Sequence, residues 1–249
     1  VQFTPSYFSK RSGFVINQLS GGGCEHMGNF PTFPVKGKLK MSPDNILNYR
    51  INVSEEKGHA GYYEAMVQED IKAKLTVTER TGMASYEYPA DQQYGTIIIG
   101  GGISATPIEQ AAIVITAPNK CEGYAEGGNF CGLRTPYKVY FVAEFDTDAF
   151  ETGTWKREEL MPNTTFAEGE YSGVYFTFDV NKKKNIQYKI GVSYVSVENA
   201  RENLKAENAE WDFQKIQNQA EAKWNHYLGM IEVEGTNPDR TTQFYTHLY

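Results

Sequence analysis

The sequence predicts a mainly β protein, an antiparallel β-sandwich followed by a short helical linker. Up to about residue 196, short runs rich in β-branched and aromatic residues recur, with Gly, Pro and Asn at the breaks between them. Residues 198–230 are instead rich in Ala, Glu, Lys, Asn and Gln, with apolar residues at helical spacing. Because no helical segment separates the earlier runs, a parallel α/β sheet is disfavoured.

The expected strands follow one another at fairly regular intervals. The first, 13–19 (GFVINQL), ends near three glycines, and the second, 47–53 (LNYRINV), alternates its side chains and leads to a turn at 57–61. The later runs are 62–67, 71–80, 83–88, 95–99, 111–115, 138–145, 173–179 and 186–195. Three lysines at 182–184 are typical of a hairpin turn with solvated side chains.

The C-terminal part predicts two helices and the start of a third. Residues 198–205 form a short helix, and residues 211–228 form a longer one with an apolar stripe made of Phe213, Ile216, Ala220, Trp224 and Leu228. After an extended crossing at 231–235, apolar side chains recur at i,i+4 up to Tyr249, with no capping Gly or Pro behind them.

We therefore expect a β-sandwich domain at 1–196, a helical linker at 197–235, and the truncated first helix of a further domain at 236–249. An apolar helical face at the end of the chain has nothing of its own to pack against. The sequence thus predicts that this face is exposed and that a segment absent from the chain completes the chemistry.

Composition excludes two classes of function. The net charge of −7 argues against a nucleic-acid binder, which needs clustered Lys and Arg. No stretch is long and apolar enough to span a bilayer. The 17 Tyr, 14 Phe and 23 Gly suit twisted sheets and surfaces that stack on flat or ring-shaped ligands.

The densest group of candidate binding residues lies in the loop 19–31 (LSGGGCEHMGNFP). Its glycines allow the backbone to approach a ligand closely, and its polar side chains offer hydrogen bonds to a sugar or a carboxylate. The alternative is a tight turn between two strands, with the polar side chains solvated. The substrate-binding candidates are Gly22, Gly23, Cys24, Glu25, His26 and Asn29.

Other chemical signals are weaker. Residues 100–102 (GGG) lack the G-x-G-x-x-G pattern and the following helix of a phosphate-binding turn. Cys121 and Cys131 either close a small loop as a disulfide or are free buried thiols, and no Cys or His spacing is typical of zinc. Carboxylate pairs that fit solvated turns better than an acid–base pair occur at 55–56, at 146 with 148, and at 158–159. Trp155 and Tyr171 either stack on a sugar or belong to the core.

Several segments together resemble the N-terminal region of glycoside hydrolase family 92, the calcium-dependent exo-acting α-mannosidases. They follow the family's order over nearly the whole chain, at 13–14, 19–24 (LSGGGC), 61–63 (GYY), 71–80 (IKAKLTVTER), 82, 139–145 (VYFVAEF), 190–195 (IGVSYV), 198–200, 203–204, 224–225, 228, 231–235 (IEVEG), 244–246 and 248–249. Gln18 departs from the pattern, because many members carry His there.

The resemblance implies a β-sandwich, a helical linker and an (α/α)6 catalytic barrel whose first helix is the segment 236–249. It places the general acid, the general base and most of the calcium site in that barrel. No catalytic and no metal-binding residue is therefore expected in this chain, whose partner would be the missing C-terminal catalytic domain.

The implied reaction is the inverting hydrolysis of terminal α-mannose in mannose-containing glycans, with calcium as cofactor of the parent enzyme. The implied location is secreted, periplasmic or cell-surface. The chain alone would be inactive and would contribute the loop 22–29 to the sugar site. The alternative is a stand-alone carbohydrate-binding or structural sandwich.

Overall fold

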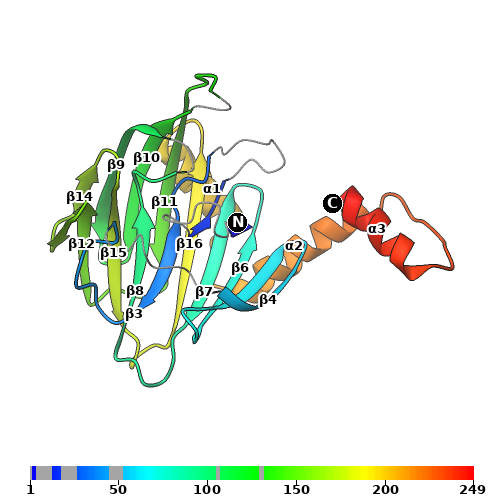
Figure 1. The fold of residues 1–249 in the computed structure, drawn as a ribbon, viewed down its shortest axis with the longest axis horizontal. Coiled ribbons are helices and arrows are strands. Elements are labelled where there is room, and N and C mark those ends of the chain that lie inside the picture. The colour runs from blue at the N-terminus through cyan, green and yellow to red at the C-terminus, as the bar shows by residue number, and fades with distance from the viewer. Residues whose placement is uncertain (1, 4–12, 18–26, 45–52, 105–106, 129–131) are drawn as a thin grey trace.

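The computed structural model describes residues 2–3, 13–17, 27–44, 53–104, 107–128 and 132–249. In this part of the chain two antiparallel sheets are stacked face to face, and three helices follow them (Figure 1). The predicted fold class, a β-sandwich followed by helices, is confirmed. Strands alternate their side chains between two faces, so each sheet buries its apolar face against the other.

Within the described residues the smaller sheet has seven strands in the order β1-β2-β3-β8-β15-β12-β13. Their bounds are β1 Gln2–Phe3, β2 Phe14–Val15, β3 Thr32–Lys36, β8 Tyr94–Gly100, β12 Glu151–Lys156, β13 Glu159–Pro162 and β15 Ser172–Asp179.

The larger sheet has nine described strands in the order β14-β9-β10-β11-β16-β7-β6-β5-β4. Their bounds are β4 Val53–His59, β5 Tyr62–Val67, β6 Ile71–Val77, β7 Thr81–Glu87, β9 Ile108–Ala117, β10 Lys120–Gly127, β11 Tyr137–Phe145, β14 Phe166–Glu168 and β16 Asn185–Ser193.

The core lies between the two sheets and is rich in aromatic rings. Phe145 of β11 packs against Phe176 and Phe178 of β15, with ring centroids 4.7 and 5.1 Å apart, so these rings join one sheet to the other. In β6 the side chains alternate, with Ile71 buried and Lys72 half-buried, as a strand that faces a core on one side requires. Such interlocking aromatic contacts fix the two sheets relative to each other.

Helix α1 (Val197–Glu207) packs on the outer face of the larger sheet. Its N-cap is Ser196, whose side chain accepts a hydrogen bond from Asn199 N. Ala200 and Leu204 are buried against Val142 of β11. This small apolar cluster fixes α1 over the centre of the sheet.

Helix α2 (Phe213–Leu228) begins at the N-cap Asp212 and packs over β5, β6 and β7. Of its predicted stripe, Ile216 and Ala220 are buried. A Cβ added at Gly61 would lie only 2.9 Å from that of Ala220, so this glycine (φ 86°) permits the close approach of α2 to the β4–β5 turn.

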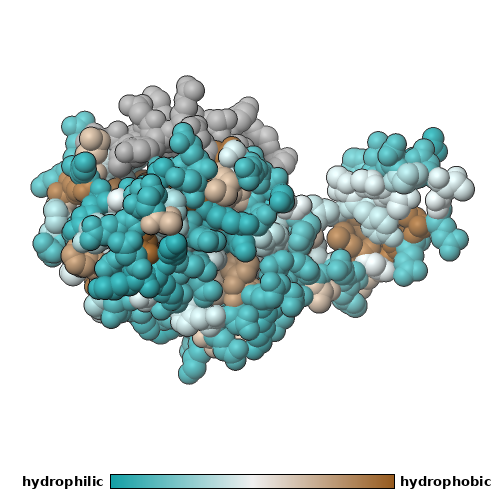
Figure 2. Space-filling view, turned by 90° about the horizontal axis from the view of Figure 1, so that it is seen from below, coloured by the Kyte–Doolittle hydropathy of each residue, from teal (hydrophilic) through white to brown (hydrophobic). Residues whose placement is uncertain are grey.

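Helix α3 (Pro238–Leu248) has no buried residue, and it lies beyond the end of α2, away from the sandwich (Figure 1). Leu248 and Tyr249 are exposed and Phe244 is half-buried, as predicted for this face. The ring of Tyr249 packs on Trp224, with centroids 4.8 Å apart. Figure 2 shows hydrophobic residues gathered in this part of the molecule, where Met230, Ile231 and Leu248 are exposed.

The lysine run 182–184 and the segment 57–61 differ from their predictions. The lysines follow a turn after β15, but β15 and β16 belong to different sheets, so the predicted hairpin is wrong. β4 continues through Gly58 to His59, and the chain turns only at Ala60 and Gly61. Most of the predicted strand 47–53 lies outside the described residues.

Several strands are not predicted by the sequence pattern, namely β1, β3, β10, β12, β13 and β14. The segment after Cys121 is not a loop, because it forms β10 between β9 and β11. Cys121 itself is a buried free thiol, which favours the thiol alternative for this residue. Cys131 and Cys24 lie outside the described residues.

Candidate functional site

The described residues on either side of the central part of the candidate binding loop are Asn17 and Met27. Of the predicted residues, Gly22, Gly23, Cys24, Glu25 and His26 lie outside the described residues. Asn29 is described and is fully buried at the base of this loop. The site can therefore be built from the residues that surround Asn29.

A tight turn presents Asn29 to its neighbours. Met27, Gly28 and Phe30 have φ values of 61°, 72° and 54°, so the backbone on both sides of Asn29 is left-handed. Phe30 anchors the turn in the core, with its ring centroid 4.2 Å from that of Phe141. The apolar anchor compensates the backbone cost of the left-handed conformation.

Asn17 closes this turn through its backbone and its side chain. Its carbonyl oxygen accepts from Gly28 N at 2.7 Å, and its Oδ1 accepts from Asn29 N at 2.8 Å. Its Nδ2 donates to Asn29 Oδ1 at 3.1 Å. Just after the end of β2, Asn17 thus supplies hydrogen bonds like those that a neighbouring strand would supply.

Asn29 is also tied to the larger sheet. Tyr137 at the start of β11 donates its hydroxyl to Asn29 Oδ1 at 2.9 Å. Because Oδ1 accepts from both Asn17 and Tyr137, the orientation of the Asn29 amide is fixed. Its Nδ2 is buried and has no acceptor among the described residues. A buried donor without an acceptor lowers the stability of the folded state.

Tyr194 completes this group of residues, which we call the Asn17 cluster (Asn17, Met27, Asn29, Tyr137 and Tyr194). Its hydroxyl accepts from Asn17 Nδ2 at 3.3 Å and donates to Met27 Sδ at 3.6 Å. The residue as a whole is 53% exposed. The cluster joins the loop base, β11 and the segment after β16 at one end of the sandwich.

The sequence pattern did not identify Asn17, Tyr137 or Tyr194 as site residues. Asn17 and Tyr194 fall inside predicted strands, although β2 ends at Val15 and β16 ends at Ser193. The sequence does carry one signal for such residues, because they are polar or aromatic and stand at the ends of strand patterns next to a glycine-rich loop. Binding residues are commonly found on such loops.

The glycines 100–102 serve packing. Gly101 N and Gly102 N both donate to Ser172 O at 2.9 Å, so these amides are not available to a phosphate. A Cβ at Gly102 would lie 1.9 Å from Gly169 O. The close approach of two backbone segments explains why glycine stands there.

The other candidates are also structural. Trp155 is fully buried in the core and offers no stacking surface, and the Arg157 guanidinium lies 5.0 Å from the centre of the Tyr171 ring. Asp146 forms an ion pair with Lys183 at 2.7 Å and belongs to the connection between the sheets. Glu56 accepts from Tyr63 at 2.7 Å, and Glu158 and Glu159 are exposed.

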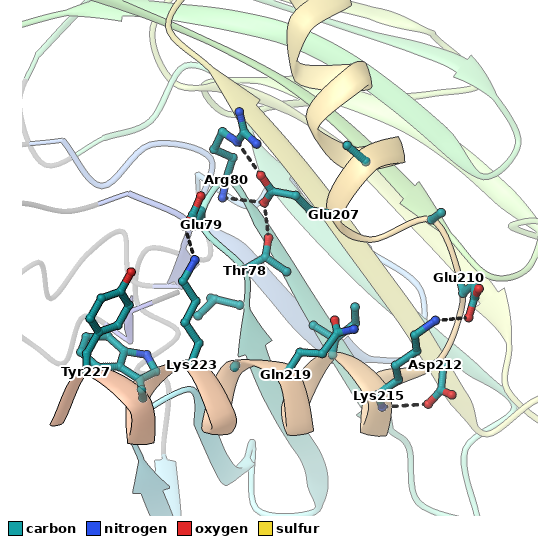
Figure 3. Close-up of a pocket in the computed structure, with 16 residues that line it drawn as sticks. Thr78, Glu79, Arg80, Glu207, Glu210, Asp212, Lys215, Gln219, Lys223 and Tyr227 are labelled. Atoms are coloured by element: carbon teal, nitrogen blue, oxygen red, sulfur yellow. Dashed lines mark hydrogen bonds and ion pairs between the residues drawn. The ribbon is translucent and has the colours of Figure 1, made fainter. Parts of the chain in front are cut away.

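A groove of about 820 Å³ lies between the β6–β7 turn and the two helices α1 and α2 (Figure 3). Six of its charged side chains form ion pairs: Glu207 with Arg80, Lys223 with Glu79, and Lys215 with Glu210. Asp212 instead caps α2 by accepting from Lys215 N. The first two pairs attach the helices to the sandwich. Most of the charges that line the groove are therefore already compensated.

Comparison with known proteins identifies the class of protein. The fold is the N-terminal sandwich of a glycosidase: the model of the glycosyl hydrolase family 92 N-terminal domain matches residues 6–193. The model of the glycosyl hydrolase family 92 catalytic domain matches residues 199–249. The chain belongs to glycosyl hydrolase family 92.

Solved structures of the same family have the same fold. A family GH92 inverting mannosidase from Bacteroides thetaiotaomicron is 26% identical over 88% of this chain and 29% of its own, with a TM-score of 0.76. A family GH92 α-mannosidase from the same organism is 25% identical over 95% of this chain and 33% of its own, with a TM-score of 0.82.

A curated relative, named an uncharacterized secreted glycosidase of Arthroderma benhamiae, is 24% identical over 91% of this chain and 32% of its own length. The chain thus spans about a third of the length of these relatives. Among the described residues no helix is both long and apolar enough to cross a membrane.

Proposed function

We propose that this chain is the N-terminal β-sandwich portion of an α-mannosidase that removes terminal α-mannose from glycans by inverting hydrolysis. The observation that supports the proposal is the match of the family model to residues 6–193, together with two solved relatives named as mannosidases. The secreted relative supports a location outside the cytoplasm.

Inverting hydrolysis requires two carboxyl groups on opposite sides of the sugar. One protonates the leaving oxygen, and the other activates a water molecule on the opposite face. Among the described residues, the groove between the β6–β7 turn and the helices is lined by Glu79, Glu207 and Glu210, and each of these carboxylates is engaged by a cation. The family's catalytic-domain model matches residues 199–249 of this chain, and we propose that the acid and the base lie outside these 249 residues.

Calcium is the cofactor that we propose for the complete enzyme. Calcium takes six to eight oxygen ligands, and the described residues contain no group of three or more acidic, His or Cys side chains that could hold a metal ion. This part of the chain does not fit a calcium cage, and we assign it no step that involves the ion.

The contribution of this chain is to shape one side of the sugar site. Gly22, Gly23, Cys24, Glu25 and His26 remain the predicted sugar-binding residues. Asn29 fixes the base of their loop through Asn17 and Tyr137.

The test is hydrolysis of an aryl α-mannoside by the 249-residue chain and by the longest gene product that contains it, each with calcium and with a chelator. We expect the longer product to release β-mannose first, as observed by NMR, and to lose activity on chelation. We expect the chain alone to be inactive. Mannose release by the chain alone would overturn the placement of the acid and base, and α-mannose as first product would overturn inversion.

A further inference from the structure

The exposed ring of Tyr194 differs from an ordinary surface tyrosine because its position is fixed. An exposed side chain normally samples several rotamers, but the Tyr194 hydroxyl accepts from Asn17 Nδ2 and donates to Met27 Sδ. Both partners lie at the base of the candidate binding loop. The polar end of the side chain is therefore anchored while the residue remains 53% exposed.

The exposed ring offers an apolar face to a ligand. The next residue in the sequence, Val195, is 74% exposed. No other described aromatic ring packs against Tyr194. A fixed, exposed aromatic ring loses little conformational entropy when a ligand stacks on it, and this preorganisation favours binding.

Asn17 connects this ring to Asn29. The two hydrogens of its Nδ2 are directed to Asn29 Oδ1 and to Tyr194 Oη, at 3.1 and 3.3 Å. One residue therefore sets the orientation of the Asn29 amide, whose own Nδ2 has no acceptor among the described residues, and the position of the Tyr194 ring. An exposed aromatic face matches a pyranose, which has apolar C–H faces.

We propose that Tyr194 is a sugar-stacking residue of this site and that Asn17 is its positioning residue. The ligand class is a hexopyranoside with α-mannosides first, and this choice rests on the proposed function. Stacking contributes to substrate binding and not to bond cleavage, so its loss changes KM and leaves kcat nearly constant.

The experiment compares Tyr194→Ala, Tyr194→Phe and a control, Phe166→Ala, in the full gene product. Phe166 on the edge strand β14 is also 53% exposed, so its removal deletes an equally exposed aromatic ring from the same sandwich. The readouts are KM and kcat on an aryl α-mannoside, and the affinity for methyl α-mannoside by calorimetry.

We expect Tyr194→Ala to raise KM and the calorimetric Kd by about threefold to tenfold, the range typical of an aromatic stacking contact. Tyr194→Phe keeps the ring but loses the anchor, so its effect should be smaller and in the same direction. Phe166→Ala should leave both constants unchanged.

The outcomes separate this inference from the proposed function. An unchanged KM and Kd in Tyr194→Ala, with an active parent enzyme, would overturn the stacking role and leave the mannosidase proposal intact. A parent protein that binds methyl α-mannoside through Tyr194 but does not hydrolyse α-mannosides would support stacking and overturn the activity. A parent protein that does neither overturns both.

Discussion

Glu207 and Arg80 lie 127 residues apart in the sequence and join the end of α1 to the β6–β7 turn, with Arg80 Nε 2.5 Å from Glu207 Oε1 (Figure 3). The other carboxylate oxygen accepts from Thr78 Oγ1 at 2.6 Å and from Arg80 N at 2.9 Å. Burial opposes the charge of Glu207, but the hydrogen bonds from Thr78 and Arg80 outweigh it and hold its pKa below the ordinary value.

Glu207→Gln should destabilise the protein by about 2 kcal/mol, because a neutral amide replaces an acceptor of charge-assisted hydrogen bonds. Urea unfolding measures the change. A folded pKa below the unfolded value of about 4.3 means that the stabilisation is complete above that pH and is lost as the pH falls through the lower folded pKa. The difference between wild type and variant should therefore shrink in acid.

Glu210→Ala is the matched control for Glu207. Glu210 forms an ion pair with Lys215 at 2.9 Å on the same junction, but its side chain is 67% exposed. We expect a change within about 0.5 kcal/mol, as for other exposed ion pairs. Equal losses in the two variants would show that the Glu207 contacts have no special importance.

Lys189→Met should loosen the connection between α1 and α2. The Lys189 ammonium is buried and donates to Asn208 O and Ala209 O, both at 3.0 Å, while Trp211 covers it at 4.2 Å. Its removal leaves two carbonyl oxygens without their donor, so we expect a loss of about 2 kcal/mol in urea unfolding.

Lys120→Met is the control for Lys189, because both lysines approach Glu144. Lys120 lies 3.0 Å from Glu144 and is 44% exposed, whereas Lys189 lies 3.9 Å away and is almost fully buried. A loss below about 1 kcal/mol is expected for the exposed pair. If Lys120→Met proved the more destabilising, the carbonyl contacts of Lys189 would not be its main contribution.

Gly102→Ala should destabilise the sandwich by about 3 kcal/mol, since the new methyl group meets a backbone oxygen that no side-chain rotation can move. Gly58→Ala on β4 is the control, because its Cβ would find neighbours only at 3.4 Å and beyond. Circular dichroism and urea unfolding of both variants measure the difference. A mild effect at Gly102 would contradict the close backbone contact.

The alternating and apolar patterns predicted β5 and β6 well, because a strand that buries one face places its apolar residues at every second position. The strand β10 was not predicted because its inward positions are Cys121, Gly123 and Ala125, whose small side chains give a weak apolar signal. Gly123 is required there by its neighbour, since a Cβ would lie 2.1 Å from Ala112 O. Such residues are required by the pairing of strands. The local sequence pattern does not show which strands pair.

The same reason limits prediction of the site. A glycine-rich loop with polar side chains indicates a binding site from the local sequence alone, and Asn29 was predicted as a binding residue on that basis. Asn17, Tyr137 and Tyr194 meet at this loop only because β2 and β16 end, and β11 begins, at the same end of the sandwich. Contacts across 108 and 177 residues are set by sheet topology, which no single motif encodes.

Cys121 should be unreactive in the folded protein. Burial raises the pKa of its thiol well above the ordinary value, and the nearby Glu122 adds to the shift, so the reactive thiolate is scarce at pH 8. We expect iodoacetamide to label Cys121 in urea but not under native conditions, with peptide mass mapping to distinguish it from the other cysteines. Rapid native labelling at Cys121 would contradict its burial.

Asn17→Asp separates the two hydrogen-bonding roles of Asn17. The carboxylate still accepts from Asn29 N, but it places an acceptor against Asn29 Oδ1, where Nδ2 donated at 3.1 Å. This contact favours the protonated carboxyl in the folded state and raises its pKa above the unfolded value of about 3.9. Because the folded state then binds the proton more tightly, stability falls as the pH rises through that window. In urea unfolding we expect a deficit of about 1 kcal/mol at pH 4 that grows to about 3 kcal/mol at pH 7, whereas Asn17→Ala should show a deficit that does not change with pH. A constant deficit in the Asp variant would mean that the amide of Asn17 does not donate to Asn29.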